Sequence, residues 1–92
     1  MDSLDKNLLP RLRWACRRGM LELDVLLGHY LEEAFQQAPP MDQKNFIHLL
    51  DCNDQELFMW LTGKELPGLP DQIDIVRKIR HHAKIRKHAP FL

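Results

Sequence analysis

The chain has 92 residues, of which 45% are hydrophobic and 28% charged, and its formal net charge is zero. This composition is typical of a soluble globular domain and excludes a disordered polypeptide. No apolar run approaches the roughly 18 residues that a membrane span requires. The N-terminal segment also lacks the uninterrupted apolar stretch of a signal peptide. We therefore expect a single cytoplasmic domain over residues 1–92, without membrane insertion.

Charge is distributed unevenly along the chain. Residues 1–18 carry five Lys or Arg against two Asp, and residues 19–71 carry two Lys against ten Asp or Glu. Residues 72–92 carry six Lys or Arg against one Asp. The chain is thus basic at both ends and acidic in the middle. Its ends either pack around the middle or meet different surfaces of a partner.

Apolar residues recur at helical spacing through the first part of the chain. A first helix should begin near residues 7–9, because Pro10 is tolerated only in the first turn of a helix. Arg17 and Arg18 should lie in its last turn, where cations complement the helix dipole. A second helix is expected over about residues 20–37, ended by two consecutive prolines.

A third and a fourth helix follow. The third should open with Asp42 as N-cap and stop near residues 51–52. The fourth should be capped by Asn53 and followed by Gly63 in the left-handed conformation. Residues 63–70 hold two glycines and two prolines and should form a loop.

The last predicted helix is capped by Asp71 and reaches at least His82, beyond which it should fray. We expect residues 1–7 and 84–92 to be flexible. No alternating apolar pattern of strand length is present. The sequence therefore predicts an all-α protein, a compact bundle of about five short helices.

The sequence gives little indication of enzyme chemistry. It has no Gly-rich phosphate loop, HExxH motif, nucleophile elbow or Asp-rich metal loop. Cys16 and Cys52 lack CxxC spacing, so we expect two reduced, partly buried thiols. His81, His82 and His88 lie in the basic C-terminal segment, without carboxylate neighbours that could complete a metal site. We predict neither an active site nor a metal site.

The basic segment 77–88 has two interpretations. One is binding to the phosphate backbone of a nucleic acid. Such a module usually adds aromatic or polar residues that read bases, and here only Phe91 follows. We favour a solvated face and expect no nucleic-acid partner.

The junction between the first two helices is the main candidate site. Residues 17–24 hold two cations, a flexible glycine and two carboxylates. One interpretation is capping, with Gly19 as N-cap and Glu22 reaching back toward it. The other is an exposed contact surface, joined by Trp14, since an indole beside arginines is typical of a binding hot spot. Physical reasoning alone leaves both interpretations open.

The segment 12–24 (LRWACRRGMLELD) resembles the signature of the flavinator family, whose hallmark is Arg-Gly-x-x-Glu. The resemblance covers about residues 8–82, and the chain departs from the family pattern at Pro10 and in its longer basic tail. A second block also matches, through Phe46, Leu49, Leu50, Asp54, Leu57, Trp60 and Leu61.

This resemblance implies a five-helix, non-enzymatic assembly factor for succinate dehydrogenase. Such a protein helps attach FAD covalently to the flavoprotein subunit of succinate dehydrogenase and, in bacterial members, of fumarate reductase. FAD then belongs to the client, so we expect no stably bound cofactor, and we expect a monomer. The same family has also carried an antitoxin label, as partner of a membrane toxin, which is the second candidate function. A small basic nucleic-acid-binding domain is the third.

The resemblance also implies which residues face the client. Arg18, Gly19 and Glu22 match the family motif and are implied to lie on the client-binding surface, flanked by Arg17 and Asp24. On this hypothesis Arg18 pairs with a client carboxylate or carbonyl, and Glu22 pairs with a client cation. Gly19 would let two backbones approach without a side chain between them.

Overall fold

The computed structural model describes residues 6–86, and every regular element in that range is helical. The predicted all-α class with five helices is confirmed. None of these helices is both long and apolar enough to cross a membrane. The elements are α1 (Leu8–Ala15), α2 (Leu21–Glu33), the 3-10 helix η1 (Phe35–Gln37), α3 (Pro40–Leu49), α4 (Asp54–Leu61) and α5 (Pro70–Arg86).

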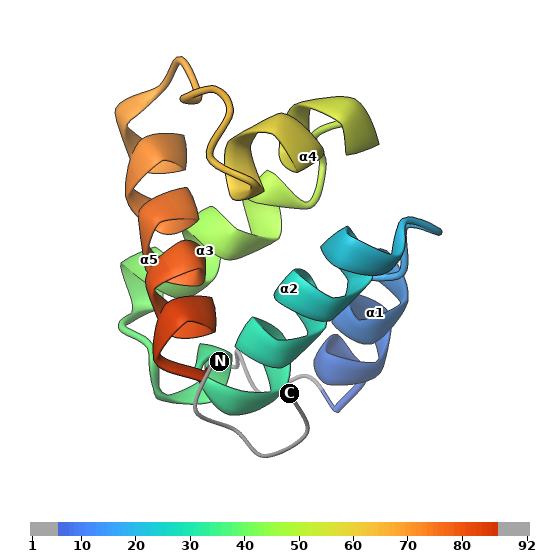
Figure 1. Cartoon of the computed structure of the whole chain (residues 1–92). Helices are drawn as coiled ribbons and strands as arrows, with labels where there is room; N and C mark the ends of the chain where they lie inside the picture. The colour runs from blue at the N-terminus through green and yellow to red at the C-terminus, as the bar shows by residue number, and fades with distance from the viewer. Residues whose placement is uncertain (1–5, 87–92) are drawn as a thin grey trace.

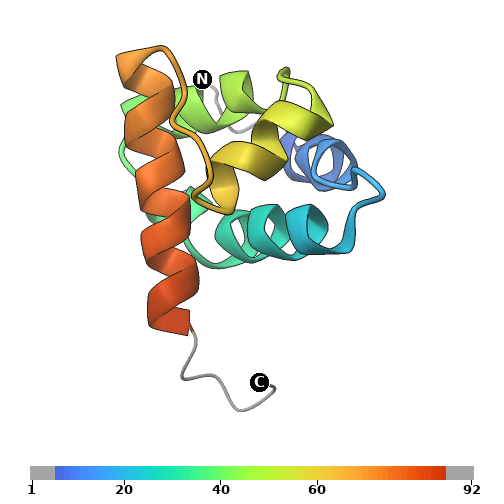
Figure 2. The ribbon, with the colours of Figure 1, turned by 45° about the horizontal axis from the view of Figure 1, so that its top comes forward.

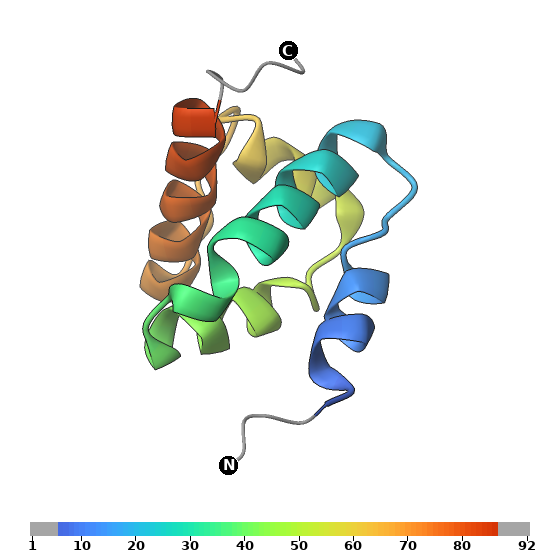
Figure 3. The same ribbon diagram turned by 90° about the horizontal axis from the view of Figure 1, so that it is seen from below.

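Helix α2 lies at the centre of the arrangement, with α1 on one side and α5 on the other (Figure 1). It also packs against α4 and η1, while α3 packs against α5. Helix α5 and the α1–α2 connection lie on opposite sides of the molecule in Figures 1 and 2. The view from below shows the same separation, with α1 and α2 side by side (Figure 3).

One hydrophobic core receives side chains from all five helices. Phe46 is fully buried, and its ring centroid lies 5.1 Å from that of Tyr30 and 5.5 Å from that of Phe35. Trp60 is also buried, as the sequence predicted. Each fully buried Leu, Ile or Phe stabilises the fold by about 1.5–3 kcal/mol. The largest such side chains are Phe46, Leu23, Leu27, Leu31, Leu49, Leu57, Ile75 and Ile79.

The C-terminal ends of α1, α2 and α3 differ from the sequence prediction, and α3 ends at Leu49 instead of near residues 51–52. Helix α1 ends at Ala15, so Arg17 and Arg18 lie in the following turn and not in the last helical turn. Beyond this end, the backbone N–H of Arg18 donates to the Asp24 carboxylate of α2 and not to a carbonyl of α1. Helix α2 ends at Glu33, because Ala34 (φ −127°) departs from helical geometry before η1 begins.

Prolines, and not Asp42 and Asp71, open α3 and α5. Pro40 and Pro70 are the first helical residues, a position where the fixed φ of proline suits the helix and its missing N–H removes no bond. Asp42 instead lies buried in the first turn of α3. Both of its carboxylate oxygens accept hydrogen bonds from Lys78 Nζ at 2.9 Å, which joins α3 to α5.

Both ends of α4 match the prediction. The side chain of Asn53 caps the helix by accepting a hydrogen bond from the Glu56 backbone N–H at 2.8 Å. Gly63 has a φ of +81° just past the C-terminus. The Lys64 N–H donates back to the Met59 carbonyl at 2.9 Å, which satisfies a carbonyl that the helix end leaves open.

Helix α5 continues to Arg86, beyond His82, where the sequence predicted fraying. The extension is held by Glu33 at the end of α2, which accepts from Arg86 Nε at 2.7 Å and contacts His82 Nε2 at 2.8 Å. The expectation that His82 lacks a carboxylate neighbour is therefore wrong. Residues 1–5 and 87–92 lie outside the described part of the chain, so their flexibility stays a prediction.

Candidate partner-binding site

The turn between α1 and α2 depends on a glycine in the left-handed region. Gly19 has a φ of +84°, and within residues 6–86 no residue other than glycine has a positive φ. A β-carbon added at Gly19 would meet no heavy atom within 4 Å. Glycine is therefore required here by the backbone conformation and not by lack of space inside the molecule. The residue is exposed, so this backbone is open to a partner.

Asp24 holds the turn from the α2 side. Its Oδ1 accepts a hydrogen bond from the backbone N–H of Arg18 at 2.6 Å. The capping interpretation needs correction in detail, because Met20 is the N-cap of α2 and Glu22 is only the second helical residue. The carboxylate that reaches back across Gly19 is that of Asp24. Its charge also lies in the first turn, where it complements the helix dipole.

Arg18 holds the turn from the inside of the molecule. Its Nε donates to Asp54 Oδ1 at 2.7 Å, and its Nη2 donates to the Cys52 carbonyl at 2.7 Å. Its Nη1 donates to the carbonyls of Ala15 and Leu50, both at 2.9 Å. One guanidinium thus joins the C-terminal ends of α1 and α3 to the first turn of α4. The carbonyls of Ala15 and Leu50 lie at helix ends, where no intrahelical N–H satisfies them.

This anchoring changes the role assigned to Arg18. A guanidinium has five N–H donors, and the four internal hydrogen bonds use four of them. The side chain is 14% exposed. A two-point pairing with a client carboxylate would break at least one of these bonds, whereas one N–H remains for the client carbonyl that the sequence hypothesis also named. Arg18 therefore also supports the turn that carries Gly19, and its contact with a client stays a prediction.

Trp14 and Arg17 form the α1 side of the exposed surface. Trp14 is 74% exposed, and the Arg17 guanidinium carbon lies 5.5 Å from the centroid of its ring. A cation over an exposed indole contributes about 0.5–1 kcal/mol. The contact therefore orients both side chains on the surface.

Glu22 and Leu21 form the α2 side of the exposed surface. The Glu22 carboxylate is exposed and makes no hydrogen bond or ion pair with the rest of residues 6–86. Leu21 is 80% exposed, and Val25, one turn further, is 38% exposed. Sequence reasoning missed Leu21, although helical spacing places it with Val25 and away from the buried Leu23.

The six residues singled out in the sequence thus separate into two groups. Arg18 and Asp24 hold the turn through internal hydrogen bonds. Trp14, Arg17, Gly19 and Glu22 are exposed. We call the exposed group, with Leu21 added, the corner surface: Trp14, Arg17, Gly19, Leu21 and Glu22.

The two cysteines are free, as predicted, and unsuited to nucleophilic chemistry. Burial raises the pKa of the Cys16 thiol to about 12, and burial also raises the pKa of Cys52. Both thiols are therefore protonated at neutral pH, whereas a nucleophilic cysteine acts as the thiolate. Within the described residues, no three His, Cys, Asp or Glu side chains gather as a metal site.

These features define a small helical domain whose candidate site is an exposed turn, held by internal hydrogen bonds and suited to binding another protein. The chain matches the family described as "Flavinator of succinate dehydrogenase" over residues 10–83. It belongs to this family, which confirms the resemblance noted in the sequence.

Bacterial relatives support the same assignment. The chain is 44% identical over 75 residues to the FAD assembly factor SdhE of Shewanella oneidensis, covering 82% of this chain and 92% of the relative. It is 51% identical over 78 residues to a protein of the same name from Vibrio vulnificus, covering 83% and 91%. A third relative of that name, from Pseudomonas aeruginosa, is 42% identical over 76 residues, covering 83% and 87%.

Proposed function

We propose that this protein promotes covalent attachment of FAD to the succinate dehydrogenase flavoprotein subunit by docking its corner surface on that subunit. Family membership supports the client, since both the family description and the relatives' names refer to flavin assembly. One observation carries the choice of surface. Gly19 is exposed at a positive φ, while Arg18 and Asp24 hold its turn through internal hydrogen bonds.

The bond-forming chemistry belongs to the client, because FAD carries its own reactivity and the nucleophile is a client histidine. The assembly factor contributes by positioning, since holding two reacting groups in line can remove much of the entropic barrier. It needs no resident cofactor for this role. We further propose that it acts as a cytoplasmic monomer and also serves the related fumarate reductase subunit.

The residues of the corner surface have three roles in this proposal. Gly19 lets a client backbone approach the turn, because no side chain stands between them. Glu22 presents a carboxylate without an internal partner to a client cation. Trp14, Arg17 and Leu21 supply the apolar and cation–π contacts that dominate many interfaces.

The proposal is tested by co-expressing the flavoprotein subunit with this chain and measuring covalent flavin by in-gel fluorescence. Glu22→Ala should lower covalent flavin about tenfold, as expected when one side of an interfacial charge pair is lost. The CD spectrum should stay unchanged and the melting temperature should fall only slightly, because a carboxylate in the first helical turn contributes about 0.3–1 kcal/mol.

Glu65→Ala is the matched control, since Glu65 is an exposed carboxylate in the α4–α5 loop, away from the corner surface. It should flavinylate the client like the wild type. Equal covalent flavin with wild type, Glu22→Ala and Glu65→Ala would remove Glu22 from the client interface. A pull-down that captures a membrane toxin and no flavoprotein would favour the antitoxin function instead.

A further inference from the structure

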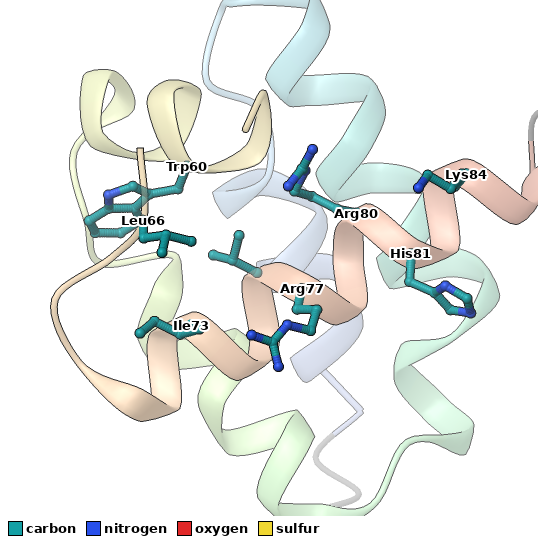
Figure 4. Close-up of a pocket in the computed structure, with 8 residues that line it drawn as sticks. Trp60, Leu66, Ile73, Arg77, Arg80, His81 and Lys84 are labelled. Atoms are coloured by element: carbon teal, nitrogen blue, oxygen red, sulfur yellow. The ribbon is translucent and has the colours of Figure 1, made fainter. Parts of the chain in front are cut away.

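A second surface, remote from the corner surface, carries its own site. A groove of about 250 Å³ runs between α5, α4 and the loop that joins them. Figure 4 shows apolar side chains gathered at one end of the groove and basic side chains following along α5. The apolar end is formed by Trp60, Leu66 and Ile73, and the basic side by Arg77, Arg80 and Lys84.

The cations on the basic side of the groove have no carboxylate partner within residues 6–86. Arg77, Arg80 and Lys84 follow at spacings of three and four residues, so they share one face of α5. None of them makes an ion pair with a described residue. The other cationic face of the same helix is neutralised. There Lys78 lies 2.9 Å from an Asp42 oxygen, and Arg86 lies 2.7 Å from a Glu33 oxygen.

One basic side chain of the groove has a defined position, because a glycine leaves room for it. The Arg80 guanidinium lies against the backbone of Gly63, where an added β-carbon would come within 2.5 Å of Nη2. Gly63, two residues past the end of α4, thus leaves the space that this side chain occupies. The guanidinium lies beside the negative end of the α4 dipole. At the apolar end, Leu66 is 75% exposed, so an apolar surface remains open to a partner.

We propose that this groove binds an acidic peptide segment of a partner protein, with one large apolar side chain inserted beside Leu66 and carboxylates paired with Arg77, Arg80 and Lys84. The volume of about 250 Å³ lies below the roughly 300–1,000 Å³ of drug-sized ligand pockets. It therefore suits one side chain better than a dinucleotide.

The same geometry disfavours a nucleic acid. Proteins that bind single strands stack bases on exposed aromatic rings, and Trp60 in this groove is only 8% exposed. Peptide docking needs only the open apolar end and the unneutralised cations, and both are present.

Fluorescence anisotropy tests the proposal with the full chain. The probes are short fluorescein-labelled peptides that place one Phe, Leu or Trp between runs of glutamate. At least one of these peptides should bind saturably. Its affinity should fall as the salt concentration rises, because salt screens the ion pairs. Arg80→Glu should weaken binding roughly tenfold, because it replaces an attraction by a repulsion. Leu66→Ser should also weaken binding, with an unchanged CD spectrum.

Lys44→Glu is the matched control, because it makes the same charge change at an exposed lysine of α3 outside the groove. It should bind the peptide like the wild type, and so should Glu22→Ala, which separates this site from the corner surface. Control peptides with glutamine for glutamate, or serine for the apolar residue, should not bind.

Several results would overturn the proposal. They are the absence of saturable binding by every peptide, equal weakening by Lys44→Glu and Arg80→Glu, or full retention of binding by Leu66→Ser. Tighter binding of a labelled single-stranded oligonucleotide, lost in Arg80→Glu, would assign the groove to nucleic acid. A dimer seen by light scattering that Arg80→Glu dissociates would assign the groove to a second copy of the chain.

Discussion

Two separate factors can restrict the residue at position 19: the backbone conformation of the isolated chain and the space left beside a bound partner. A φ of +84° strains residues with a β-carbon by about 1–2 kcal/mol, and asparagine by less. The space beyond the α-carbon is open, so the isolated chain could hold a side chain there. Stability and partner binding should therefore respond differently to substitution at this residue.

Gly19→Ala and Gly19→Asn separate the effect on stability from the effect on client binding. Alanine should lower the free energy of unfolding by about 1–2 kcal/mol and asparagine by less, because asparagine tolerates the left-handed region better. If Gly19 contacts the client backbone, the larger asparagine should still reduce covalent flavin at least as much as alanine. Urea unfolding and in-gel flavin fluorescence measure the two effects. A variant series in which flavinylation simply follows stability would contradict the contact role.

At the scale of the helices, Arg18 is the residue that connects elements. It donates to the carbonyls that end α1 and α3 and to the carboxylate in the first turn of α4. Hydrogen bonds with a charged donor contribute about 1.5–3 kcal/mol each. The whole set is less than additive because the four bonds share one guanidinium.

Arg18→Lys tests this connection. A lysine ammonium has three donors on a flexible chain and cannot reproduce the planar fork. We expect a loss of about 2–4 kcal/mol in the free energy of unfolding, since carbonyls such as that of Leu50 lose a charged partner. Arg17→Lys is the control, since Arg17 is exposed, and it should change stability by less than about 0.5 kcal/mol. Unchanged urea unfolding of Arg18→Lys would show that the guanidinium network adds nothing to the fold.

The helices and most of the corner surface could be predicted from the sequence, whereas the contacts between residues far apart in the chain could not. Helical spacing, the Asn53 cap and Gly63 are local signals, and they gave α4 correctly. The role of Arg18 depends on acceptors 32 to 36 residues away along the chain. No local pattern reveals such partners, so a surface role and an internal role look the same in the sequence.

At the scale of the whole molecule, two ionic contacts hold the C-terminal helix on the bundle. Asp42 of α3 pairs with Lys78 at the middle of the helix. Glu33 of α2 pairs with Arg86 and contacts His82 near its end. The bundle closes through contacts between residues that are 36 to 53 positions apart, and acid should weaken the contact at Glu33.

Acid stability tests the closure at Glu33. Hydrogen bonding from Arg86 lowers the pKa of the Glu33 carboxyl to about 2 from its usual value of 4.5. The pair therefore stabilises the fold fully above about pH 4.5, and its contribution is lost as pH falls toward 2. The carboxylate is 37% exposed, so solvent screening limits the effect to roughly 1 kcal/mol or less.

Urea unfolding of the wild type and Glu33→Gln at several pH values should show the variant less stable at pH 7. The difference should shrink between about pH 4.5 and 2, because protonation then removes the same charge from the wild type. Glu65→Gln, which removes an exposed carboxylate of the α4–α5 loop, should show no such convergence. A stability difference between wild type and Glu33→Gln that stays constant with pH would mean that the Glu33 charge does not hold α5 to α2.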